Sequence, residues 1–228
     1  MEKLIAVLIA AHIIADFLLQ PGVLERRKKK AGFLLLHVAI HAVLNYLFLQ
    51  AWTCWQAPIL VLVIHGLIDL IKQRIGKESV NTFLIDQAAH FLSLMAIAWI
   101  LVETGWLPGF SGAGYKAFIM TAGFILTVQA SGFLITKLIK RLLENNDLEL
   151  DGLKNGGKWI GQLERALIFL FIFLGQPAGI GFLVAAKSIL RFEEAKKQKM
   201  GEYVLIGTLL SFSLGIALTS LTRWAVGF

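Results

Sequence analysis

The sequence has a single cysteine, Cys54, and few charged residues for its length. One cysteine excludes an intrachain disulfide and any zinc or iron–sulfur site built from several cysteines. Charged residues make up 16% of the 228 residues, whereas a soluble domain has about a quarter. The mean hydropathy is +0.72 and 57% of residues are hydrophobic. This composition indicates a membrane protein rather than a soluble enzyme.

The apolar residues are grouped in runs of about 17–25 residues, the length that a helix needs to cross a bilayer. They predict an all-α fold, a polytopic transmembrane helical bundle of about eight spans. The expected spans are residues 3–20, 31–51, 57–72, 82–103, 117–138, 158–175, 177–191 and 203–223. The first is expected to be a retained helix, because it lacks a small-residue cleavage site and a strongly basic start. Residues 1–104 and 105–228 are expected to form two four-helix halves of one membrane domain.

The connections between these spans alternate in charge. The first, third, fifth and seventh hold most of the 22 Lys and Arg residues, and the others hold none. By the positive-inside rule, the odd-numbered connections face the cytoplasm and both termini face away from it. We therefore expect a multi-pass protein of the bacterial inner membrane. The net charge of +7 is explained by this topology, so no nucleic-acid partner is expected.

The chain has only five histidines, and all lie in pairs of ionisable residues spaced four apart within the first four spans. The pairs are His12/Asp16, His37/His41, His65/Asp69 and Asp86/His90. A spacing of four places both members on one face of a helix. At a rise of 1.5 Å per residue, all four pairs lie about 4–15 Å from the cytoplasmic ends of their spans. One converging polar centre that opens to the cytoplasm is therefore expected.

Imidazole and carboxylate groups are the ligands of zinc, non-haem iron and manganese. All eight paired residues are candidate ligands of a divalent metal, with zinc expected first and iron or manganese as alternatives. Eight groups exceed the needs of one tetrahedral ion, so one or two ions are expected. Asp16, Asp69 and Asp86 are also the candidates for a catalytic base. A proton- or ion-conducting network and a purely structural polar network remain open.

The second half of the chain has no histidine but carries ionisable residues inside its apolar segments. Arg165, Lys187 and Arg191 are candidate substrate contacts, since basic side chains suit a phosphate or a lipid headgroup. The alternative is that the long side chains reach the interface and that Glu164 pairs with an arginine to hold helices together.

Several strings of the sequence are familiar. They are "HIIADFLLQP", "HGLIDLIK", "DQAAH" and, near the end, "GQLERALIF", "AAKSILRF" and "EYVLIGTLLSF". With these strings the chain resembles a bacterial family of integral membrane proteins known as a domain of unknown function. The resemblance implies a helical membrane fold, and it implies that the paired residues belong together as one set. It implies no activity, because none is established for that family. A weaker likeness, in pattern only, is to membrane-bound metal-dependent hydrolases. The zinc protease signature HExxH is absent.

The preferred hypothesis is a membrane-embedded metal-dependent hydrolase that acts on a lipid, a phosphorylated lipid or another amphipathic substrate. Its expected partners are therefore membrane lipids. A metal-ion or proton transporter would use the same cluster, but the outer half of the first four spans is almost wholly apolar. A structural or signalling subunit with a polar core is the third hypothesis. The sequence pattern specifies neither the substrate nor the oligomeric state.

Overall fold

The computed structural model describes residues 1–20, 31–76, 79–107, 112–146, 155–190 and 198–227. These residues form helices joined by short connections, and no strand occurs among them. The prediction of an all-α fold is therefore confirmed. The chain divides into two compact units, one of Met1–Ala122 with Ala225–Phe228 and the other of Gly123–Trp224. Each unit is described by itself, and the expected division near residue 104 stays a prediction.

Each of the eight predicted spans corresponds to one helical segment of the described residues. In the first unit these are α1 (Glu2–Phe17), α3 (Ala31–Leu49), α4 (Gln56–Ile75) and α5 (Val80–Glu103). A continuous segment follows, made of α6 (Tyr115–Ile125), a π-helical turn (Leu126–Ala130) and α7 (Ser131–Asn146). The last three are α8 (Gly156–Phe173), α9 (Ala178–Leu190) and α11 (Gln198–Val226).

Four of these segments are long and apolar enough to cross a membrane, which indicates a membrane protein. They are Ala31–Leu49, Val80–Glu103, Tyr115–Lys140 and Gln198–Val226. The other four are shorter or carry more charge; α1, for example, has 16 residues and α9 has 13. That these four also cross the membrane stays a prediction.

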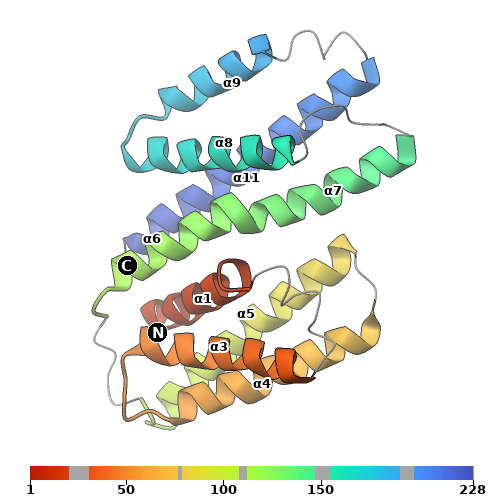
Figure 1. Ribbon diagram of the computed structural model, residues 1–228. Coiled ribbons are helices and arrows are strands. Elements are labelled where there is room, and N and C mark those ends of the chain that lie inside the picture. The colour runs from red at the N-terminus through yellow and green to blue at the C-terminus, as the bar shows by residue number, and fades with distance from the viewer. Residues whose placement is uncertain (21–30, 77–78, 108–111, 147–154, 191–197, 228) are drawn as a thin grey trace. The chain divides into compact units, whose positions relative to one another are not determined.

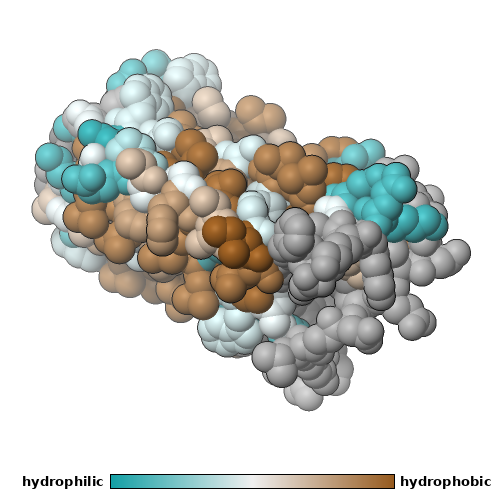
Figure 2. Space-filling view, turned by 90° about the horizontal axis from the view of Figure 1, so that it is seen from above, coloured by the Kyte–Doolittle hydropathy of each residue, from teal (hydrophilic) through white to brown (hydrophobic). Residues whose placement is uncertain are grey.

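Large apolar side chains cover much of the outer surface. On α5, Ile85 and Leu92 are 68% and 65% exposed, and none of the residues of α9 is buried. Figure 2 shows one face of the molecule, largely hydrophobic, with hydrophilic side chains gathered toward its edges. Apolar surface of this extent is unusual for a soluble monomer and fits contact with lipid.

The first unit contains a ring of four helices. α3 packs against α1 and α4, and α5 packs against α4 and α1, so the four lie side by side (Figure 1). Apolar side chains fill one end of this bundle, where the core includes Leu8 of α1, Leu49 of α3, Val61 of α4 and Leu101 of α5. All of them are at most 1% exposed. In a membrane this core stabilises the bundle through close packing rather than through exclusion of water.

Local contacts set where α4 ends and where α5 begins. α4 ends at Ile75 and is capped by Gly76, whose N–H donates to the Lys72 carbonyl and whose φ of 65° favours glycine. α5 begins with a capping box. The Ser79 hydroxyl accepts from the Thr82 N–H at 3.1 Å, and the Thr82 hydroxyl accepts from the Ser79 N–H at 2.8 Å. These contacts fix the ends of two helices that pack against each other.

Candidate metal centre

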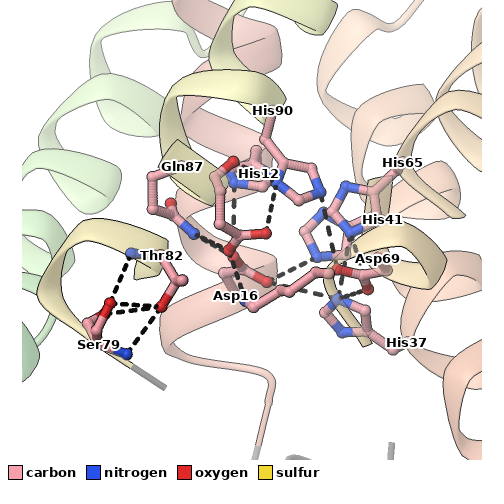
Figure 3. A network of polar contacts seen from close by, with 12 residues as sticks. His12, Asp16, His37, His41, His65, Asp69, Ser79, Thr82, Gln87 and His90 are labelled. Carbon is pink, nitrogen blue, oxygen red and sulfur yellow. Dashed lines mark hydrogen bonds and ion pairs between the residues drawn. The ribbon is translucent and has the colours of Figure 1, made fainter. Parts of the chain in front are cut away.

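The eight paired residues meet at the end of the bundle opposite the apolar core, and Figure 3 labels all of them except Asp86. Asp16 and Asp69 lie toward the C-terminal ends of α1 and α4, and His37 and Asp86 lie toward the N-terminal ends of α3 and α5, because neighbouring helices run in opposite directions. All five histidines are buried, with at most 4% of their surface exposed. The structure thus brings together all eight paired residues: His12, Asp16, His37, His41, His65, Asp69, Asp86 and His90. Their individual roles stay predictions.

Four of these side chains, those of Asp16, His37, His41 and His65, have one ligand atom each within 4.8 Å of the others and could hold a metal ion. Asp16 Oδ1 lies 3.2 Å from His41 Nε2 and 3.5 Å from His37 Nε2. The Nε2 atoms of His37 and His65 are 3.2 Å apart. A tetrahedral zinc ion with bonds of about 2.0–2.1 Å separates its ligand atoms by about 3.3–3.4 Å. Three of the six distances among these donors therefore match a tetrahedral site, and the other three are at most 4.8 Å.

Asp69 lies beside this group and contacts three histidines. Its Oδ2 is 3.3 Å from His37 Nε2 and 3.8 Å from His65 Nε2, and its Oδ1 is 3.9 Å from His90 Nε2. His65, Asp69 and His90 form a second set that could hold a metal ion. The two sets share His65, so the cluster has more donors than one tetrahedral ion requires.

His90 is oriented by its own helix. Its Nδ1 lies 2.9 Å from the Asp86 carbonyl, one turn earlier in α5. Since a carbonyl only accepts hydrogen bonds, Nδ1 carries the proton and Nε2 carries the lone pair. Metal-binding histidines are commonly oriented in this way by a carbonyl.

Asp86 lies at the edge of the cluster and belongs to neither ligand set. Its Oδ2 accepts from Lys72 Nζ at 2.5 Å and from Gln87 Nε2 at 3.4 Å. Its Oδ1 is 3.6 Å from His90 Nδ1 and has no hydrogen-bond partner among the described residues. The Asp86 side chain is 4% exposed, whereas that of Lys72 is 46% exposed. Lys72 thus links the buried carboxylate to the surface.

Sequence reasoning missed Gln87 and Lys72 as members of the site. The Gln87 amide donates to Asp16 Oδ2 at 3.1 Å and so joins α5 to α1. A usable signal existed for Lys72, because His65, Asp69 and Lys72 follow the i, i+4, i+7 spacing of one helix face. For Gln87 no helical spacing relates it to Asp16, which lies on another helix.

The carboxylates of the cluster lie among imidazole rings. Burying a carboxylate is costly unless a cation or hydrogen bonds offset its charge. Asp86 is paired with Lys72, Asp16 accepts from the Gln87 amide, and both Asp16 and Asp69 face imidazoles. Imidazole nitrogens and carboxylate oxygens together are the donors that divalent metal ions use in proteins.

Two of the predicted substrate contacts lie in the second unit and have partners there. The Arg165 guanidinium is 3% exposed. It donates to the Val128 carbonyl in the π-helical turn at 2.8 and 3.3 Å, and to the Ser211 hydroxyl at 3.0 Å. Lys187 pairs with Glu164 at 2.7 Å. Arg191 lies outside the described residues. A role of these three residues in substrate binding stays a prediction.

Gly132 makes room for Arg165, and we expect Gly132→Ala to destabilise the second unit. A Cβ at Gly132 would lie 2.8 Å from Arg165 Nη2, so the guanidinium would have to leave its hydrogen bonds. The expected loss is about 1–3 kcal/mol, seen as a lower thermal midpoint in detergent. Gly181→Ala is the matched control, because a Cβ there meets nothing within 4 Å. Equal midpoints for the two variants would contradict this packing.

Comparison with known proteins bears on the first half of the chain. Residues 4–109 match the model of a family described as "Protein of unknown function (DUF3307)". The predicted resemblance to a family of unknown function is therefore confirmed for this segment, which includes all eight residues of the cluster. The C-terminal strings lie beyond the matched residues. No curated protein and no solved structure matches the chain.

Proposed function

We propose that this protein is a membrane-embedded hydrolase that depends on a divalent metal held by the His/Asp cluster. The observation that carries the proposal is the group of Asp16, His37, His41 and His65. Three imidazoles and one carboxylate form a donor set that favours zinc, with iron or manganese as alternatives. Two further carboxylates of the same cluster, those of Asp69 and Asp86, lie close enough to act on a substrate at that centre.

The chemistry divides between the metal and the side chains around it. A bound divalent ion supplies Lewis acidity and lowers the pKa of a coordinated water toward neutrality. Asp86 is suited to act as the general base. Lys72 and Gln87 hold its Oδ2 in place, and its Oδ1 remains without a hydrogen bond. A carboxylate that is held by one oxygen can accept a proton at the other.

The burial of the cluster points to an amphipathic substrate. A lipid or phosphorylated lipid would approach from the apolar surface of the bundle and place its polar group at the centre. The lysine- and arginine-rich connections support a centre on the cytoplasmic side of a bacterial inner membrane, with both termini on the opposite side.

Metal analysis and a hydrolysis assay test this function together. Protein purified in detergent without chelator should contain at least about one zinc ion per chain. It should hydrolyse members of a panel of p-nitrophenyl carboxylic and phosphate esters and fluorescent phospholipids, and a zinc chelator should stop the reaction. Less than about one ion per five chains would refute the metal centre. Bound metal without hydrolysis of any member would refute the hydrolase.

The variant Asp86→Asn distinguishes a general base from a metal ligand in the same experiment. We expect hydrolysis to fall by at least about 100-fold while the metal content stays unchanged, because Asp86 belongs to neither ligand set. Loss of metal in this variant would make Asp86 a ligand instead. Unchanged hydrolysis would remove it from the mechanism.

One observation favours a metal or proton transporter as the second candidate. Asn45 continues the polar face of α3 one turn beyond His41 and is 1% exposed. Its amide donates to the His41 carbonyl at 2.9 Å, and its Oδ1 has no hydrogen-bond partner among the described residues. A polar residue at this depth would extend a path away from the cluster. Metal-dependent flux in proteoliposomes, without hydrolysis, would support this candidate.

A further inference from the structure

According to the carboxylate oxygen that they face, the five histidines fall into a first set of His37, His41 and His65 and a second set of His12 and His90. This division by carboxylate oxygen differs from the two candidate ligand groups described above, which share His65. Asp16 Oδ1 faces His37 and His41 at 3.5 and 3.2 Å, whereas Asp16 Oδ2 faces His12 at 3.5 Å. Asp69 repeats the pattern. Its Oδ2 faces His37 and His65, and its Oδ1 faces His90. Each carboxylate therefore turns one oxygen to each set.

A carboxylate with ligands on both sides is the arrangement that joins two metal ions. In sites with two metals the ions lie about 3.5–4 Å apart, a distance that the two oxygens of one carboxylate can span. A single ion would use only one side of Asp16 and of Asp69. The other side would then have no role in ligation.

The second set contains ring nitrogens without hydrogen bonds. His12 and His90 are 0% and 1% exposed. Neither ring nitrogen of His12 has a hydrogen-bond partner among the described residues, and neither has Nε2 of His90. The two rings are stacked with centroids 5.0 Å apart. Buried polar atoms are rarely left unpaired. For His90 the lone pair on Nε2 is free, because Nδ1 donates to the Asp86 carbonyl.

His65 belongs to the first set rather than the second. Its Nε2 is 3.2 Å from His37 Nε2 and 3.8 Å from Asp69 Oδ2. The Nε2 atom of a neutral imidazole has one lone pair and can bind one ion. With His65 in the first set, His12, His90 and Asp69 remain for a second ion.

We propose that the cluster binds two divalent cations that share the carboxylates of Asp16 and Asp69. The first lies among His37, His41 and His65, and the second lies between His12 and His90. This inference rests on the proposed metal centre and adds a second ion to it.

Cobalt titration of the metal-free protein tests the second site. Cobalt is used as a probe because it takes tetrahedral nitrogen and oxygen ligands and its absorption and electron paramagnetic resonance report coordination and coupling. We expect two ions per chain and magnetic coupling between them. His90→Ala should reduce the stoichiometry from two to one and abolish the coupling. His12→Ala is a second variant with the same expected result, in case His90→Ala does not fold.

Ser93→Ala is the matched control on α5, because its hydroxyl donates to the His90 carbonyl and offers no ligand to the cluster. It should keep two coupled ions. Saturation at one ion in the unaltered protein would overturn the second site and leave the metal centre in place. Two ions without coupling would overturn the shared carboxylates. Binding of no ion would overturn the proposed metal centre itself.

Discussion

His37→Ala is expected to lower the affinity for zinc by at least tenfold and to leave the purified protein with little bound metal. His37 Nε2 has three donor atoms close to it, at 3.2 Å (His65 Nε2), 3.3 Å (Asp69 Oδ2) and 3.5 Å (Asp16 Oδ1). Loss of a residue that only orients a ligand already costs about 10–100-fold in metal affinity. Loss of a ligand should cost at least as much. Elemental analysis and competition with a chelator measure the change.

His65→Ala should behave in the same way, because His65 belongs to the same set of donors. Val38→Ala provides a control for packing, since Val38 is a buried neighbour of His37 on α3 and carries no ligand atom. It should keep its zinc. Unchanged zinc content in both histidine variants would show that the centre lies elsewhere.

Asp16→Asn is expected to abolish the stabilisation of the protein by zinc. In the unaltered protein, zinc at about 100 times its dissociation constant should stabilise the fold by about 2.7 kcal/mol, seen as a higher thermal midpoint in detergent. Asp16 contributes an oxygen 3.2 Å from His41 and another 3.5 Å from His12. An amide keeps the shape of this side chain and removes its charge, so the zinc-dependent rise should disappear.

Another partly buried carboxylate serves as the control for Asp16→Asn. Glu164→Gln is the matched control, because both carboxylate side chains are 12% exposed. It should retain the full zinc-dependent rise. A rise of normal size in Asp16→Asn would remove Asp16 from the metal centre.

Much of the helical architecture was predictable because its determinants are local. Apolar runs of bilayer length and the periodicity of the helix give the eight segments and the faces of the four pairs. The alternation of basic connections gives their directions, and hence the common level of His12, His37, His65 and His90. The residues at which the helices begin and end were less predictable. α9 is two residues shorter than expected and α11 begins earlier, at Gln198.

The neighbours of individual side chains were not predictable from such patterns. Arg165 was a candidate for substrate binding, but it bonds to the Val128 carbonyl in a π-helical turn. No periodic pattern in the sequence predicts that π-helical turn. Gln87 joins the cluster through Asp16 of α1, and that contact depends on how far α5 is rotated toward α1.

The sequence by itself determined that this chain forms apolar helices and that four of them carry ligand-type pairs on one face. It did so because helix length and the spacing of residues on a face depend only on the order of residues along the chain. Only the tertiary structure decided which oxygens of Asp16 and Asp69 face which histidines. That choice depends on the rotation and crossing of four helices packed together, and each helix is held in place by the other three.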